Sequence, residues 1–424
     1  MFLWSWGANS HGQLGLGIAN EQVEKPAKVN IELYDNSIRQ IACGGGHTLL
    51  VDSEGKLFSC GLNFNLQLGT DNNVHSFERT WKLSGINFTN VACGWDFSCG
   101  ITDDQFLFVW GSNSYGQLGL PQNEFPKNLK PIRLQVKACA VSMGLRHTAI
   151  INSKGEVWIT GCGRHGQLGL GREHLSSDRF CKVPKLGKIS HIACGQRHTV
   201  AWSTDENALF VWGDNRHGQL LLANEKYPKA YTPQKIDIDV RQKVKKLLTG
   251  WSNVLLWLED GTLITWGCNH YSQLGSDVAL PSGCRTYIKL PDGRQVQDIA
   301  LGSEHTICLS TDNTLWAWGW NEHLNTGIKC VDDEKCISKP TLVPLDIGEN
   351  AIITQIYCGG AQNFIVTEDK VGSADSNSDL ERLERGDGGR PQFARRDFNQ
   401  SQFSLSRTYT DRLRAAARGH SRTI

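Results

Sequence analysis

The stretch WGANSHGQLG at residues 6–15 returns as WGSNSYGQLG at residues 110–119, and related versions of this phrase occur seven times in the 424-residue chain. The glycine of its Trp-Gly, Cys-Gly or Thr-Gly step lies at positions 7, 61, 111, 161, 213, 267 and 319. A second phrase begins at Gly44, Gly94, Gly144, Gly195, Gly250, Gly302 and Gly359. The spacing of 50 to 54 residues between the first-phrase glycines indicates a repeat architecture.

Each repeat contains a hairpin of two apolar strands. The clearest is HTLLV at residues 47–51, followed by a turn at residues 52–55 and by KLFSCG at residues 56–61. Runs of β-branched, aromatic and aliphatic residues bounded by Gly, Asp, Asn and Ser are typical of strand–turn–strand units. One such sheet cannot bury both of its faces, whereas sheets stacked radially can. The sequence therefore predicts an all-β protein with a seven-bladed β-propeller of four-stranded blades over residues 1–368.

The two ends of the repeat region complement each other. Leu3–Gly7 matches the last strand of each hairpin but has no partner before it in the sequence. The last repeat supplies residues 356–359 and 363–367 and then lacks a Trp-Gly strand. We therefore expect the N-terminal strand to complete the last blade and close the ring, which removes open sheet edges.

Composition limits the class of protein. The 44 basic and 43 acidic residues nearly balance, and there is no run of 18 or more apolar residues that would predict a membrane-spanning helix. Residues 369–424 are polar with few aliphatic side chains, and we expect a disordered tail there. The 14 cysteines include no CxxC pair, which favours free thiols in a reducing compartment; a disulfide or metal at Cys330 and Cys336 is a minor alternative.

No catalytic motif is visible, and the sequence predicts no catalytic residue, no cofactor and no metal site. Four histidines share one repeat position: His47, His147, His198 and His305. With one histidine in each blade, they would lie too far apart to share a zinc ion. We expect each to bond to the backbone of its own or the next blade; the alternative is that some of them face a partner at the mouth of the ring.

The segment IACGGGHTLLV at residues 41–51 resembles the signature of the regulator of chromosome condensation repeat family. Related versions stand at residues 144–148, 195–199 and 302–306, and the resemblance covers about residues 2–367. It implies a seven-bladed propeller closed by strands from both ends of the chain. The segments ACGWDF, GSEH and WGWNEH, at residues 92–97, 302–305 and 318–323, are similar to the secretion-regulating exchange-factor branch of that family.

That branch has no chromatin-binding arm, and the resemblance implies a cytoplasmic and partly nuclear protein that binds a small GTPase of the Ran type, the exocyst, or both. We expect this protein to take no small-molecule substrate. The candidate partner-binding residues are Trp95, Asp96, Trp251, Glu304 and His305. They share one repeat region and therefore open on the same side of the ring, and aromatic side chains beside charges are typical of binding hot spots.

Two other functions remain open, and a third can be dismissed. The first is a scaffold without exchange activity, because the repeats are even in length and show no counterpart of the wedge-like insertion of the family founder. The second is a chromatin-associated exchange factor for Ran, which the net charge of +1 disfavours because nucleic-acid affinity depends largely on phosphate neutralisation. The third is ultraviolet photoreception, which is disfavoured because neither Trp95 nor Trp251 has an adjacent arginine.

Overall fold

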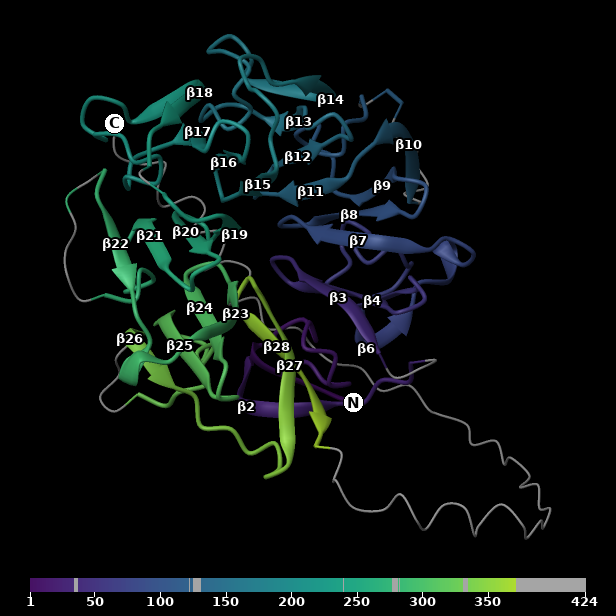
Figure 1. Ribbon diagram of the computed structural model, residues 1–424. Helices are drawn as coiled ribbons and strands as arrows, with labels where there is room; N and C mark the ends of the chain where they lie inside the picture. Colours follow the sequence, from purple (N-terminus) through teal and green to yellow (C-terminus); the bar gives the residue numbers. More distant parts are fainter. Residues whose placement is uncertain are drawn as a thin grey trace, which may run out of the picture. The chain divides into compact units, whose positions relative to one another are not determined.

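The computed structural model describes residues 1–33, 37–121, 123–124, 131–238, 240–276, 281, 283–330 and 335–370. Over these residues the strands form seven four-stranded antiparallel sheets, which stand as blades around a ring (Figure 1). The prediction of an all-β, seven-bladed propeller is confirmed. The expected polar tail lies, from residue 371 onward, outside the described residues.

The blades are numbered in chain order, each from its innermost to its outermost strand. Blades 1 to 3 contain β3 (Ile38–Cys43), β4 (His47–Asp52), β5 (Leu57–Gly61) and β6 (Val74–Arg79); β7 (Phe88–Cys93), β8 (Phe97–Thr102), β9 (Phe106–Gly111) and β10 (Ile132–Lys137); and β11 (Ala140–Met143), β12 (His147–Ile151), β13 (Val157–Cys162) and β14 (Ser176–Lys182). Blades 4 to 6 contain β15 (His191–Cys194), β16 (His198–Ser203), β17 (Ala208–Asp214) and β18 (Lys229–Ile236); β19 (Val244–Thr249), β20 (Asn253–Leu258), β21 (Leu263–Gly267) and β22 (Arg285–Ile288); and β23 (Val296–Leu301), β24 (His305–Ser310), β25 (Leu315–Trp320) and β26 (Cys336–Leu342). Blade 7 contains β27 (Ala351–Gly359), β28 (Gln362–Asp369), β1 (Phe2–Ala8) and β2 (Gln22–Val29). Two short 3₁₀ turns lie between blades, at Trp81–Leu83 and Pro291–Gly293.

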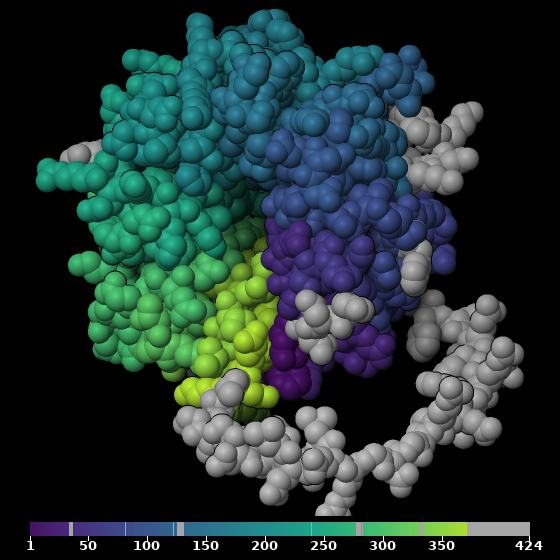
Figure 2. Space-filling view, turned by 45° about the vertical axis from the view of Figure 1, so that its right-hand side comes forward, coloured from purple at the N-terminus to yellow at the C-terminus, as the bar shows by residue number. Residues whose placement is uncertain are grey.

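Blade 7 closes the ring with strands from both ends of the propeller. β1 lies between β28 and β2, and Leu3 is paired with Val366 in the antiparallel register. The inner strand β27 then packs against β3 of blade 1. Figure 2 shows the yellow C-terminal strands directly beside the purple N-terminal segment. The predicted closure by the N-terminal strand is confirmed.

The first phrase holds neighbouring blades together along the seams between them. Its leucine is fully buried in six repeats: Leu14, Leu68, Leu118, Leu168, Leu220 and Leu274. The glutamine before it works through both its side chain and its backbone. In blade 1, Gln67 Oε1 accepts the backbone N–H of Asn65 at 2.9 Å, and the Gln67 carbonyl accepts the Trp110 indole N–H of blade 2 at 2.8 Å. Trp212 and Trp266 donate to Gln167 and Gln219 in the same way.

The glycine of the Trp-Gly step is required by the backbone. Gly161 has φ of 108°, and a Cβ built there would lie 2.4 Å from the carbonyl oxygen of Arg146. A side chain at this position would therefore combine a strained conformation with a steric clash. The equivalent glycines all have positive φ: Gly7, Gly61, Gly111, Gly213, Gly267 and Gly319.

Two expectations drawn from composition can be compared with the structure. All 14 cysteines lie among the described residues, and each is a free thiol, Cys330 and Cys336 included. Within the described part of the chain there is no helix with the length and apolar character needed to span a membrane.

Candidate functional site

The two phrases meet at one side of each blade. The residue after each Trp-Gly glycine donates its backbone N–H to the third residue of the second phrase, as Ser112 does to Asp96 at 3.0 Å and Cys268 does to Ser252 at 2.9 Å. The same bond joins Trp320 to Glu304 in blade 6. These loops and turns therefore form one surface of the propeller, called here the mouth face.

The centre of the mouth face is a narrow channel along the ring axis. It is lined by the first residues of the second phrase from every blade, together with the residue that precedes each phrase. The cavity has a volume of about 160 Å³, below the roughly 300–1,000 Å³ typical of small-molecule pockets. The channel does not have the size of a nucleotide or substrate site.

Two of the predicted site residues meet in this channel. Trp95 of blade 2 and Trp251 of blade 5 pack with their ring centroids 5.8 Å apart and their planes tilted by 53°. Gly45 makes room for this pair, because a Cβ there would lie 2.6 Å from the Trp95 ring. The backbone also fixes both residues: Gly45 N–H donates to Trp95 at 3.0 Å, and Trp251 N–H donates to Ser303 at 2.7 Å.

Asp96 lies beside the tryptophan pair and reaches outward to a neighbouring blade. Its Oδ2 accepts the Asn65 side-chain amide of blade 1 at 3.0 Å. Burial raises the pKa of the Asp96 carboxyl, while Ser112 and the Arg146 guanidinium act in the opposite direction. Arg146 in turn lies 4.2 Å from the centre of the Tyr115 ring, a cation–π contact.

Glu304 occupies the equivalent position in blade 6. Its Oε2 accepts the Gln273 side-chain amide of blade 5 at 2.5 Å. Burial raises the pKa of Glu304 to about 8, and the bond from Gln273 opposes this shift. A carboxyl with this pKa is largely protonated at neutral pH.

His305 follows Glu304 in sequence but lies inside the seam. Its Nε2 is 2.8 Å from Asn363 Oδ1 of blade 7, and its side chain is 1% exposed. His47 and His147 likewise reach Ser98 and Thr199 of the next blade at 2.9 and 3.0 Å. These three histidines reach the next blade through side-chain oxygens, so the expected bonds to backbone are wrong for them; within the described residues neither ring nitrogen of His198 has a hydrogen-bond partner. The structure therefore brings Trp95, Asp96, Trp251 and Glu304 to the mouth face and keeps the four repeat histidines beneath it.

Sequence reasoning missed several residues of the mouth face. Tyr115, Tyr271 and His217 share one position of the first phrase, and Trp320 follows the Trp-Gly step of blade 6. Tyr271 is 43% exposed, and its ring lies 6.3 Å from that of Trp320. The signal that could have found them is the substitution pattern inside the first phrase, where aromatic, basic and small residues alternate between repeats.

The fold is a seven-bladed propeller, and aromatic and charged side chains gather at its mouth face. The chain belongs to the RCC1-like domain family, whose model matches residues 2–365. The expected resemblance to the regulator of chromosome condensation repeats is thereby confirmed.

Two sequence relatives and one solved structure are similar to this chain. The chain is 33% identical to the secretion-regulating guanine nucleotide exchange factor of Mus musculus over 398 residues, covering 86% of this chain and 83% of the relative. It is 30% identical to the ultraviolet-B receptor UVR8 of Arabidopsis thaliana over 76% of this chain and 74% of the receptor. The fold is also that of Prp20p from Saccharomyces cerevisiae, with a TM-score of 0.75, 22% identity, and coverage of 90% of this chain and 93% of that one.

Proposed function

We propose that this propeller binds a small GTPase of the Ran type on its mouth face, lowers the affinity of that GTPase for guanine nucleotide, and acts with exocyst machinery in regulated secretion. The observation that carries the proposal is the similarity, over 86% of the chain, to a secretion-regulating guanine nucleotide exchange factor. Independent support comes from the residues of the mouth face.

Nucleotide exchange requires no covalent chemistry. A factor that binds the nucleotide-free GTPase more tightly than the loaded one lowers nucleotide affinity by the same ratio. The mouth face suits a protein partner, because it presents the rigid pair Trp95 and Trp251 with Asp96 and Arg146 nearby. Its central cavity is too small for the nucleotide itself.

The test is the release of fluorescent GDP from a panel of small GTPases, Ran included, with and without the full-length chain. Release driven by chelation of magnesium sets the maximum. We expect the chain to accelerate release from at least one member of the panel. If binding occurs without faster release, the scaffold function replaces exchange; if no GTPase binds, the proposal is wrong.

The mouth face is tested by Asp96→Ala combined with Glu304→Ala. This pair should weaken partner binding roughly tenfold, as expected for hot-spot residues, while the thermal midpoint stays within a few degrees. Tyr287→Ala is the matched control, because this tyrosine is exposed on the outermost strand of blade 5. A large fall in thermal midpoint for the double variant would show that these residues hold blades together instead.

A further inference from the structure

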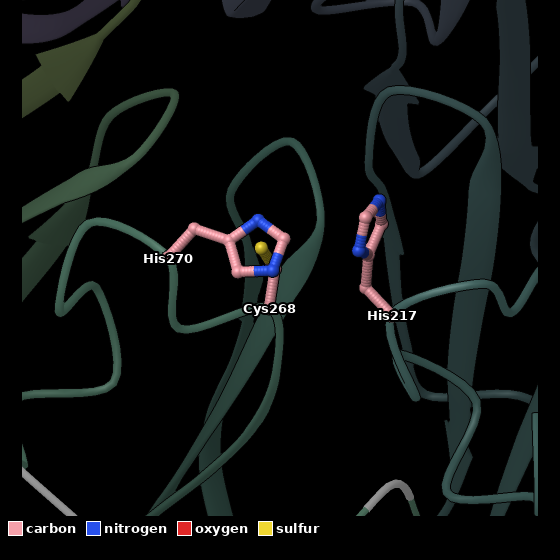
Figure 3. A group of neighbouring side chains, drawn as sticks. All are labelled: His217, Cys268 and His270. Atoms are coloured by element: carbon pink, nitrogen blue, oxygen red, sulfur yellow. The ribbon is translucent and has the colours of Figure 1, made fainter. Parts of the chain in front are cut away.

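Three side chains with metal-ligating atoms meet at the seam between blades 4 and 5. His217 stands on the turn after β17, and Cys268 and His270 stand on the turn after β21 (Figure 3). One nitrogen of each histidine and the sulfur of Cys268 all lie within 4.8 Å of one another. The two imidazole rings are 5.4 Å apart and nearly perpendicular, at 87°.

Both turns are held by their own backbone bonds. The N–H of His217 donates to Gln219 Oε1 at 2.9 Å, and the N–H of Cys268 donates to the Ser252 carbonyl at 2.9 Å. Asn269, between the two ligating residues, accepts the N–H of Leu274 at 3.0 Å and donates to the Ser276 carbonyl at 2.9 Å. The positions of the three Cα atoms are therefore fixed, and only the side chains need to adjust.

We propose that His217, Cys268 and His270 bind a zinc ion across this seam, with a fourth position open to water or an exogenous ligand. Two imidazoles and one thiolate are a donor set that suits Zn²⁺ and disfavours Mg²⁺ and Ca²⁺, which prefer oxygen. Zinc–ligand distances of roughly 2.0–2.3 Å place donor atoms about 3.5 Å apart in a tetrahedron. Contraction from the observed spacing requires only side-chain rotation, because His270 is exposed and His217 is half-buried.

Zinc would bind Cys268 as the thiolate, so the thiol has to lose its proton when the metal binds. Cys268 is buried, and burial together with the nearby Glu304 carboxyl raises the pKa of its thiol to about 11. A zinc ion would stabilise the thiolate directly, since a coordinating thiol is deprotonated by the metal.

The preceding seam, between blades 3 and 4, supports this interpretation. At its equivalent positions stand His165, Asp214 and Arg216. There the Arg216 guanidinium pairs with the buried Asp214 carboxylate at 2.7 Å and supplies a built-in cation. In the seam of blades 4 and 5 a cysteine replaces the aspartate and a histidine replaces the arginine, so a ligand set takes the place of an ion pair. Among the seven seams, the sequence combines three ligating residues at these positions only here.

The experiment uses the full chain without a histidine tag. Zinc affinity and stoichiometry are measured by competition with a chromophoric chelator, and Co²⁺ replaces zinc for spectroscopy. We expect one zinc per chain and a thiolate-to-cobalt charge-transfer band with the ligand-field absorption of a tetrahedral site. Cys268→Ser should abolish that band, and His270→Gln should weaken zinc binding at least tenfold, as roughly expected for perturbing a metal site.

His11→Gln is the matched control, because His11 holds the repeat position of His217 in a seam whose other two positions are Leu62 and Phe64. It should leave zinc binding unchanged. His270→Gln keeps the test valid if the buried Cys268→Ser variant folds poorly, since His270 is exposed. Absence of stoichiometric zinc binding, or binding that survives both ligand substitutions, would overturn the proposal. Neither readout depends on a GTPase, so this result is independent of the proposed function.

Discussion

The four repeat histidines should make the propeller labile to mild acid, and His198→Asn tests this. His198 is fully buried, and burial lowers its pKa to about 4, against about 6.5 for an exposed histidine. The same cause lowers the pKa of His47 and His147 to about 3 and that of His305 to about 4. Each histidine is therefore neutral in the folded protein at a pH where it is protonated in the unfolded chain.

The sign and size of the effect follow from proton linkage. As the pH falls below 6.5, the unfolded state binds a proton that the folded state excludes, so stability present at pH 7.5 is lost progressively toward pH 4. At pH 5.5 a histidine with an unfolded pKa near 6.5 contributes a loss of roughly 1.4 kcal/mol, and four contribute roughly 5.6 kcal/mol. This is a substantial part of the net stability of a domain.

The assay is urea unfolding at pH 7.5 and at pH 5.5, for the wild-type chain and for His198→Asn. Asparagine already stands at this repeat position as Asn253 in blade 5, so the backbone accommodates it. Any packing defect is common to both pH values and cancels in the comparison. The variant should lose roughly 1.4 kcal/mol less than the wild type between the two conditions.

The control is His75→Asn, because His75 is exposed on β6. This control should show the wild-type dependence on pH. If His198→Asn also loses as much stability as the wild type, the buried histidine is not the origin of the acid sensitivity and the linkage argument fails.

Two further predictions concern the ends of the chain. Deletion of residues 1–7 removes the fully buried Leu3 and Trp6; loss of one buried tryptophan costs roughly 3–5 kcal/mol, so the thermal midpoint should fall sharply, and an unchanged melting curve would mean that the ring does not need β1. Limited proteolysis should leave a stable fragment that ends near residue 370, as the polar composition of the segment beyond it predicts, whereas protection of Arg407–Arg422 in the isolated protein would contradict this.

The architecture could be predicted from the sequence because a fixed period makes every blade a copy of the others. The hairpin at residues 47–61 defines the unit, and the unpaired strand at residues 3–7 defines the closure. Because Trp95 and Trp251 hold the same position in their repeats, the sequence also predicted that both lie on one side of the ring. Their contact could not be predicted, because they stand in blades 2 and 5, and meeting across the axis depends on small residues such as Gly45 leaving the centre open.

The group formed by His217, Cys268 and His270 could not be predicted from the sequence for a related reason. Repeat alignment compares equivalent positions, whereas a seam joins non-equivalent positions of neighbouring blades. His217 aligns with Tyr271, but in space it faces Cys268 and His270. Which positions of two neighbouring blades face each other depends on how the blades pack. This relation can be read in the sequence only after the packing of one seam is known.

The seams also explain how this propeller can vary its mouth face without losing its fold. The bonds that join blades are buried and repeated: the tryptophan-to-glutamine bond of Trp110 and Gln67 lies beneath the surface, while Asp96 and Arg146 lie at its edge. An exposed polar contact such as the one between Asn65 and Asp96 contributes about 0–1 kcal/mol, whereas a buried tryptophan contributes several times more. Substitutions at the edge positions therefore change what a seam can bind far more than they change the stability of the ring. This separation allows one seam to carry an ion pair, the next a group of two histidines and a cysteine, and the central channel a pair of tryptophans.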